Sequence, residues 1–283
     1  MKIAITGESQ LDLTDEQLKE LDIHIVHMNI EKDGENYSDD AFSLGELFEY
    51  TSKTNKYCRT AATNVGAYQV FFEKILKEYD EIIHLALSST LSCCYQNALI
   101  AREDNPKIHV VDTLSSSGGS ALYAILAAKR RNEGKSVDEI LDELNKRIPH
   151  RECSFQIDSL EYIHRGGRCS KVTMFGANIL KIKPVIVCEE DGKLHLGKLH
   201  RGRQEKVVKD YFDEVLAQDN IDKEFAFMEY STLTESGMKL FEECVQRAKD
   251  AGFKEVFIGK CTPIAAYHAG PNIIGIQFLH KNY

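Results

Sequence analysis

The sequence predicts an α/β protein of two domains: an N-terminal domain with a parallel sheet flanked by helices, then a C-terminal α+β domain with a mixed sheet. Three observations predict this class. Apolar stretches of strand length alternate with helical stretches over the first half, which is typical of a parallel sheet covered on both faces. The second half contains Asp191-Gly192 between two apolar runs, a strong hairpin signal. The length of 283 residues exceeds that of a typical single domain.

The first half is predicted to alternate strands with helices. Three helices begin with a capping box, a Ser or Thr followed three residues later by Glu or Gln. The boxes are Thr14 with Gln17, Ser43 with Glu46, and Ser136 with Glu139. Strands are expected over residues 2–6, 23–28, 82–87 and 108–111, and helices over residues 14–21, 43–50, 65–79, 95–102, 117–131 and after Ser136.

The second half changes character after Pro149. Two strands, over residues 182–188 and 194–199, flank the Asp191-Gly192 turn. Further helices are expected over residues 205–217 and 233–251, and further strands over residues 225–230, 255–259 and 275–279. We place the domain boundary near residue 150, which gives an N-terminal α/β domain of residues 1–150 and a C-terminal α+β domain of residues 151–283.

Composition and charge exclude several classes of protein. The net charge of −9 argues against a nucleic-acid binder, which carries a basic face. No run of about 18 apolar residues is present to span a membrane, and the apolar run before Gly7 is too short for a signal peptide. We therefore expect a cytoplasmic protein. The eight cysteines include no C-x-x-C pair, so neither structural zinc nor disulfides are expected.

A cluster of hydroxyl groups lies between a predicted strand and the helix that follows it. The segment from Ser88 to Ser92 reads Ser-Ser-Thr-Leu-Ser. Backbone N–H groups at a helix start form a small anion site together with the helix dipole, and the three serine hydroxyls add donors to it. The alternative is that Ser89 or Ser92 only caps the helix. The polar segment 112–117 follows the next strand, at the sheet edge where ligands bind in such folds.

Standard catalytic motifs are missing from the sequence. It contains no G-x-G-x-x-G, G-x-x-x-x-G-K-[ST], G-x-S-x-G or H-E-x-x-H. Cys93 and Cys94 stand at a helix start, where a thiol pKa falls, but no activating base is visible. This favours a binding protein with no catalytic group, metal or cofactor. The competing interpretation is a small-molecule hydrolase or phosphotransferase that uses Asp112, His268 or Cys93 in the cleft between the domains.

Segments that run in order along the whole chain carry a resemblance to a known family. They are residues 8–13 (ESQLDL), 59–64 (RTAATN), 88–96 (SSTLSCCYQ), 111–113 (VDT), 160–170 (LEYIHRGGRCS), 182–186 (IKPVI), 191–193 (DGK), 200–203 (HRGR) and 268–271 (HAGP). The patterns L-E-Y-x-x-x-G-G-R and H-x-G-P are the most specific. The chain resembles the DegV family of fatty acid-binding proteins, the acyl-carrier subunits of bacterial fatty acid kinase.

The resemblance implies a ligand and a partner. A long-chain fatty acid lies in an apolar tunnel between the two domains, and a separate kinase catalytic subunit phosphorylates its carboxylate to an acyl phosphate. The positions that match the carboxylate site are Thr60, Ser92, Cys93 and His268. Two arginines that match the kinase-docking positions are Arg168 and Arg201. Because the kinase brings the nucleotide and the metal, the missing catalytic motifs are expected.

The tunnel wall is expected to come from both domains. Its candidate residues are Leu114, Phe175, Ala177, Ile179 and Ile274. The chain departs from the family pattern at Cys93-Cys94, where Gly-Thr is usual, and at Ser116-Ser117, which make the wall more polar. The resemblance leaves room for a transient contact with a membrane. A third interpretation is a regulatory module that only senses lipid.

Overall fold

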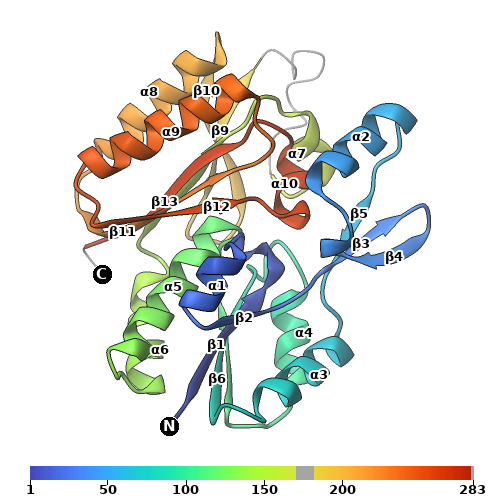
Figure 1. Cartoon of the computed structure of the whole chain (residues 1–283), viewed down its shortest axis with the longest axis vertical. Helices are drawn as coiled ribbons and strands as arrows, with labels where there is room; N and C mark the ends of the chain where they lie inside the picture. Colours follow the sequence, from blue (N-terminus) through green and yellow to red (C-terminus); the bar gives the residue numbers. More distant parts are fainter. Residues whose placement is uncertain (170–181, 282–283) are drawn as a thin grey trace.

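The computed structural model describes residues 1–169 and 182–281. Its described part contains two main sheets and one small sheet, each built from a separate part of the chain (Figure 1). The strands of the first main sheet lie between residues 3 and 112, and those of the second between residues 151 and 280. This mixed α/β arrangement confirms the predicted fold class. The proposed boundary near residue 150 falls between the last helix before the second sheet and the first strand of that sheet.

The first main sheet is parallel throughout and has the strand order β2-β1-β6-β7. Its strands are β1 (Ile3–Glu8), β2 (Ile23–Val26), β6 (Glu81–Ala86) and β7 (Ile108–Asp112). Alternate side chains of β1 face opposite sides of the sheet, as the period of a strand requires. Ala4 packs with the helices α3 (Val65–Ile75) and α4 (Cys94–Ala101), whereas Ile3 and Ile5 pack with α5 (Gly118–Asn132). Both faces are therefore buried.

The three predicted capping boxes are all present. They begin α1 (Asp15–Glu20), α2 (Leu44–Thr54) and α6 (Val137–Arg147). In each box the hydroxyl of Thr14, Ser43 or Ser136 accepts a bond from the backbone N–H three residues later. These side chains satisfy N–H groups that have no partner inside the helix, so the boxes locate the helix starts.

The second main sheet is mixed and has the strand order β10-β9-β8-β13-β11-β12. Its strands are β8 (Arg151–Gln156), β9 (Lys183–Cys188), β10 (Leu194–His200), β11 (Ile221–Tyr230), β12 (Glu255–Lys260) and β13 (Ile274–His280). The predicted hairpin is confirmed: β9 and β10 pair antiparallel around Gly192, whose φ is 75°. Helices α8 (Gln204–Leu216) and α9 (Glu235–Asp250) cover one face.

Helix α5 joins the two main sheets into one body. Residues 118–128 of this helix are all buried, which is typical of a helix surrounded by protein. They share one hydrophobic core with Ile3 and Ile5 of the first sheet and with Phe225 and Phe227 of the second. The loop that leads into α5 is therefore held between the sheets.

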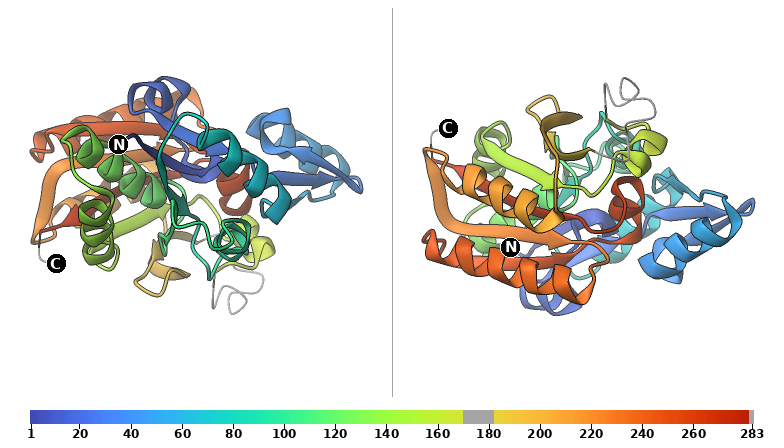
Figure 2. Two further views of the ribbon diagram at one scale, coloured as in Figure 1. Left: turned by 90° about the horizontal axis from the view of Figure 1, so that it is seen from below. Right: turned by 90° about the horizontal axis from the view of Figure 1, so that it is seen from above.

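Several elements were not predicted. The small antiparallel sheet β4-β3-β5 consists of β3 (Asn29–Lys32), β4 (Glu35–Ser38) and β5 (Arg59–Ala61). Asp33-Gly34 signals its hairpin, but the mostly exposed β4 has no apolar alternation. Strand β8, the short helices α7 (Glu161–Gly166) and α10 (Pro263–Ala269), and the 3-10 turns η1 (Ser9–Leu11) and η2 (Asp39–Ala41) were also missed. The small sheet and α2 project from the rest of the chain (Figure 2).

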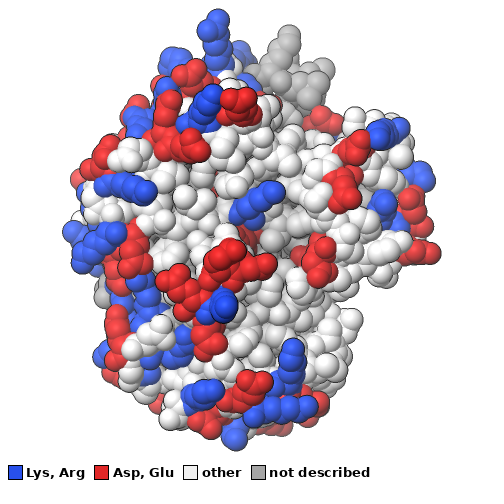
Figure 3. Space-filling model, viewed as in Figure 1, with Lys and Arg blue, Asp and Glu red and all other residues white. Residues whose placement is uncertain are grey.

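Charged side chains of both signs are mixed over the surface. Lys and Arg alternate with Asp and Glu on the face drawn in Figure 3, without a large basic area. This agrees with the net charge of −9. Across residues 1–169 and 182–281, none of the helices combines the length and the apolar character needed to cross a membrane.

Candidate functional site

One pocket contains most of the polar residues singled out in the sequence. It leaves about 870 Å³ of space unfilled by protein atoms, part of it open to solvent. Most of its wall is apolar, with contributions from Met28, Ala62, Leu87, Leu91, Phe155, Ile163, Leu194, Ile264, Ala265, Ala269 and Ile273. Its polar members are Gln10, Thr60, Ser92, Ser116, Ser117, Arg168, Glu229, Cys261 and His268. Both halves of the chain contribute.

Thr60 and His268 meet in the wall of this pocket. The Oγ1 atom of Thr60 on β5 lies 2.6 Å from the Nε2 atom of His268 on α10. The neighbouring Tyr267 fixes α10 against the small sheet and α2, because its hydroxyl contacts the Thr51 hydroxyl at 2.5 Å and accepts from the Cys58 N–H at 3.0 Å. The position of His268 is therefore set by contacts on either side of it.

The imidazole of His268 is held neutral. Burial, and the positive charge of Arg168 to a smaller extent, lower the pKa of His268 to about 4. Gly166 of α7 packs directly on this ring: a Cβ atom added to Gly166 would lie 2.8 Å from Nδ1 of His268. A neutral imidazole has one N–H donor and one acceptor nitrogen. Because the contact with Thr60 uses one of the two protons of this pair, one proton is left to donate to an anion.

The three serines of the cluster before α4 lie in three different environments. The Ser92 hydroxyl lines the pocket and accepts a bond from the Cys94 N–H at 3.3 Å. The buried Ser88 hydroxyl instead donates to the Gly192 carbonyl at 2.8 Å. Ser89 is exposed. The expectation that three hydroxyls share one anion site is therefore corrected: only Ser92 is placed to contact a ligand, because the strand end turns Ser88 inward and Ser89 outward.

A buried carboxylate, that of Glu8, holds the start of this loop in place. Glu8 accepts hydrogen bonds from the Tyr68 hydroxyl at 2.5 Å and from the Leu87 N–H at 2.9 Å, and its Oε1 atom lies 3.1 Å from Nε2 of His84. Burial alone raises the pKa of Glu8, but the His84 imidazole and the bonds from Tyr68 and Leu87 outweigh it and lower the pKa overall. Glu8 thus anchors the residue directly before the serine cluster.

The two arginines expected to dock a kinase lie in different places. Arg168 lines the pocket, is exposed, and donates to the Gly166 carbonyl at 2.6 Å. Arg201 is also exposed but does not belong to the pocket wall. The positive charge of Arg168 is therefore available to a ligand anion near His268.

Three other predicted residues lie outside the pocket wall. Cys93 is exposed, at the residue before α4. Leu114 packs on the edge of the core around α5. Ile274 begins β13 and faces the core beneath α8 and α9, so its neighbour Ile273 lines the pocket instead. The remaining predicted wall residues, Phe175, Ala177 and Ile179, lie outside the described residues.

A second polar group lies in the wall, and of its members only Ser117 was predicted to make the wall more polar. It consists of Gln10, Ser117, Glu229 and Cys261, with Asp12 directly behind it. One signal was available: Glu229 is the only charged residue within the apolar run 225–230 of the sequence. The partners of Glu229 come from distant parts of the chain, which the sequence does not indicate.

Asp12 and Glu229 form a buried pair of carboxyl groups joined by Ser117. The Ser117 hydroxyl contacts Asp12 and lies 2.6 Å from Glu229, and the Gly118 N–H donates to Glu229 at 2.8 Å. Burial and the charge of Glu229 raise the pKa of Asp12 to about 8, and burial raises that of Glu229. Because one hydroxyl proton serves only one acceptor, a protonated Asp12 donates to Ser117, which in turn donates to Glu229.

In the described part of the chain, two groups of side chains of the kinds that bind metals lie close together. One is Asp12, Glu229 and Cys261, and the other is His27, Asp39 and Asp40. In the first group all four carboxyl oxygens already have hydrogen-bond partners, from Thr262, Ser117, Gly118 and Gln277. This donor arrangement fits a hydrogen-bonded acid pair better than a cation.

Comparison with known proteins gives one family. The model of the DegV family of uncharacterised proteins matches residues 2–281. A DegV domain-containing protein of Streptococcus pyogenes is 31% identical over 291 residues, which cover 100% of this chain and 99% of that protein. A DegV domain-containing protein of Caldanaerobacter subterraneus is 30% identical and covers 99% of each chain.

Solved structures have the same fold. The chain superimposes on a DegV family protein from Thermus thermophilus, described by its fatty acid binding, with a TM-score of 0.86, 24% identity and coverage of 99% and 100% of the two chains. A stearic acid-binding protein from Eubacterium ventriosum gives a TM-score of 0.82 with 25% identity and 98% coverage of each chain.

Proposed function

Because the chain belongs to the DegV family, we propose that it binds a long-chain fatty acid in this pocket and presents the carboxylate to a separate kinase for phosphorylation to acyl phosphate. The observation that carries the proposal is the Thr60–His268 contact in the wall of a mostly apolar pocket. A carboxylate needs several donors once it leaves water. An alkyl tail needs an apolar wall, and each buried CH₂ contributes about 0.8 kcal/mol.

The carboxylate end is assigned to Thr60, Ser92 and His268. Thr60, Ser92 and His268 are only partly buried, and the neighbouring Arg168 is exposed. Glu229, at the other polar part of the wall, is buried. The ligand anion therefore lies nearer to solvent, where a second protein can reach it, and the tail extends toward the buried part of the pocket. Arg168 adds a positive charge at this end.

The kinase partner is the finer part of the proposal. A carboxylate oxygen that attacks the terminal phosphate of a nucleotide triphosphate forms an acyl phosphate and releases the diphosphate. The kinase supplies the nucleotide and the metal, so this chain has only to hold the carboxylate with one oxygen accessible. Arg201, exposed and outside the pocket wall, is proposed as a docking residue, together with Arg168.

The placement of the alternative catalytic residues supports binding over catalysis. Asp112 accepts hydrogen bonds from the backbone N–H groups of Ser89 and Leu114 and does not line the pocket. Cys93 also lies outside the wall. A hydrolase would need these groups to converge with His268 on one substrate atom.

Native mass spectrometry of the purified protein tests the proposal. We expect a mass increment of one fatty acid, which organic extraction releases and identifies. Addition of a fatty acid kinase catalytic subunit and ATP then yields acyl phosphate, trapped as the hydroxamate. Failure to bind any fatty acid of long chain, or turnover of ester or phosphate substrates by this chain alone, contradicts the proposal. Lipid binding without acyl phosphate formation by any matching kinase favours a lipid-sensing role.

A further inference from the structure

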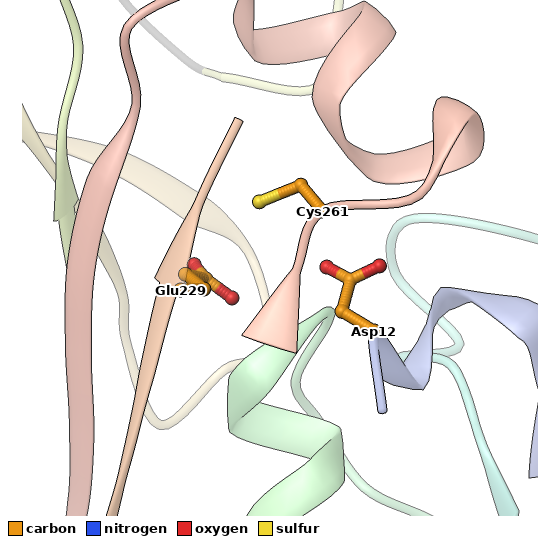
Figure 4. A group of neighbouring side chains, drawn as sticks. All are labelled: Asp12, Glu229 and Cys261. Carbon is orange, nitrogen blue, oxygen red and sulfur yellow. The ribbon is translucent and has the colours of Figure 1, made fainter. Parts of the chain in front are cut away.

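The inner part of the pocket wall contains hydrogen-bonding groups. An unsubstituted alkyl tail has no atom that could bond to them. These groups are Gln10 on η1, Ser116 and Ser117 before α5, Glu229 on β11 and Cys261 after β12. Figure 4 shows how Asp12, Glu229 and Cys261 approach one another from three separate elements. All of this wall except Ser116 is buried. It is therefore a second polar patch in the wall of this mostly apolar pocket, in addition to the one at Thr60 and His268.

Gln10 carries an unpartnered donor at this patch. Its side chain is 1% exposed, and its Oε1 atom accepts a bond from the Ser117 N–H at 2.6 Å. This bond fixes which way the amide is turned, because the Ser117 N–H requires an acceptor. The Nε2 atom of the same amide has no hydrogen-bond partner among the described residues. A buried donor left in this state is costly.

The neighbouring groups supply acceptors. The Ser116 hydroxyl has no hydrogen bond to another described residue, and Glu229 is held against the cavity with Gln277 and Gly118 as its donors. Gly118 and Gly275 leave room for this carboxylate: a Cβ atom on either would lie 2.7 Å or 3.0 Å from a Glu229 oxygen. One oxygen atom of a ligand at this patch can therefore accept from Gln10 and donate to an acceptor beside it.

The patch lies away from the carboxylate end. Cys261 directly precedes the segment that becomes α10, and His268 lies near the end of that helix. His268 lies five positions after Pro263, the first residue of α10, which corresponds to about 7–8 Å of helix at 1.5 Å per residue. A fatty acid whose carboxylate contacts His268 and whose tail runs along α10 passes this patch with the middle of its chain.

We propose that the pocket selects fatty acids that carry a neutral oxygen, a hydroxyl or a keto group, near the middle of the chain. Gln10 Nε2 donates to that oxygen, and a hydroxyl at this position also donates to Glu229 or Ser116. The inference rests on the proposed function, since it assumes that the carboxylate lies at Thr60 and His268. It adds the class of fatty acid that the site accepts.

The test compares octadecanoic acid with octadecanoic acids that carry one hydroxyl group, either near the middle of the chain or on the last carbon. Competition binding to the full chain measures the three affinities. We expect the mid-chain hydroxy acid to bind about tenfold more tightly than octadecanoic acid, the effect of one satisfied buried hydrogen bond. The terminal hydroxy acid binds no more tightly than octadecanoic acid, because its hydroxyl oxygen lies beyond the patch.

Two variants test whether the patch causes the preference for the mid-chain hydroxy acid. Gln10→Leu abolishes the preference, measured as the ratio of the two affinities in the same variant, and the exposed Gln246→Leu on α9 is its control. If Gln10→Leu does not fold, Ser116→Ala reduces the preference and Ser89→Ala is the matched control. Equal affinities of the wild-type protein for the plain and mid-chain hydroxy acids, or a preference unchanged in Gln10→Leu and Ser116→Ala, overturn the inference. If neither acid binds, the proposed function fails as well.

Discussion

The Oγ1 atom of Thr60 lies 2.6 Å from the Nε2 atom of His268, although the two residues are 208 positions apart in the chain. The contact joins the small sheet to α10 at the pocket wall. It places a hydroxyl beside a neutral imidazole, because the pKa of His268 is lowered to about 4. The Thr60 hydroxyl, the His268 imidazole and the Ser92 hydroxyl form the proposed carboxylate end, on which the first prediction depends.

Loss of one of these donors weakens fatty acid binding. Ser92→Ala and His268→Ala each remove one charge-assisted hydrogen bond, worth about 1.5–3 kcal/mol, so the affinity for a long-chain fatty acid falls roughly tenfold to hundredfold. Isothermal titration of delipidated protein measures this. Ser89→Ala, in the same segment but exposed, keeps the wild-type affinity. Unchanged binding in both variants removes the assignment of the carboxylate end.

Gly166 is expected to tolerate no side chain at this site. In Gly166→Ala the new Cβ atom would lie 2.8 Å from Nδ1 and 3.3 Å from Cβ of His268, so the ring has to shift from the position in which it contacts Thr60. We expect an affinity loss of about tenfold, comparable to the loss of one hydrogen bond. Gly45→Ala on α2 meets only Ser43 at 4.0 Å and serves as the control. Equal affinities of the two variants contradict this packing.

Charge reversal at Arg201 and Arg168 distinguishes fatty acid binding from kinase docking. Arg201→Glu is expected to abolish acyl phosphate formation by the kinase while fatty acid binding stays unchanged, because Arg201 lies outside the pocket wall. Arg168→Glu is expected to lower both, since Arg168 lines the pocket near His268. Lys254→Glu, at an exposed residue directly before β12, controls for the change in net charge. A parallel loss of both activities in Arg201→Glu indicates a structural role instead.

The length of the bound chain depends on the space beside α10. Ala265 lines the pocket between the carboxylate end and the inner polar patch. Ala265→Leu fills part of this space, and overpacking costs about 1–3 kcal/mol, so the affinity for octadecanoic acid falls roughly tenfold to hundredfold and shorter acids are preferred. Extraction and mass spectrometry of co-purified lipids give the chain-length profile. The same profile in Ala265→Leu as in Ala217→Leu, an exposed control, means that the tail does not pass Ala265.

The acid pair makes the stability of the protein depend on pH. Burial and the charge of Glu229 raise the pKa of Asp12 from 3.8 to about 8 in the folded chain. Between these values the folded state holds a proton that the unfolded state has lost, so this group reduces the free energy of unfolding as the pH rises. The slope is at most about 1.4 kcal/mol per pH unit.

Asp12→Asn tests this linkage, because the amide can donate to Ser117 and accept from the Thr262 N–H as the protonated acid does. We expect the free energy of unfolding of the variant, relative to the wild type, to increase between about pH 5 and about pH 7. Urea denaturation at both pH values measures it. His268 titrates in both proteins and cancels in the difference, whereas Glu229 interacts with Asp12 and contributes to the difference. A difference independent of pH means that Asp12 is ionised in the folded state.

Local sequence signals determined the helix starts and one hairpin. The boxes at Thr14, Ser43 and Ser136 and the Asp191-Gly192 turn each depend on residues close together in the chain, and all four are present. The apolar run 82–87 similarly indicated β6, which is buried on both faces. The exposed β4 has no such pattern, and the short helix α10 is too brief for a clear period. Those elements depend on packing instead.

The family motifs can be read from the sequence alone, and they predict that Thr60, Ser92 and His268 belong to one site. Which side chains reach the cavity depends on how the distant segments pack. Ile273 lines it while Ile274 faces the opposite core, because neighbouring residues at a strand start point to opposite faces. Likewise, Asp12 and Glu229 meet only because η1 and β11 are brought together around Ser117 at the start of α5. Contacts between distant segments depend on strand order and register, which no local pattern encodes.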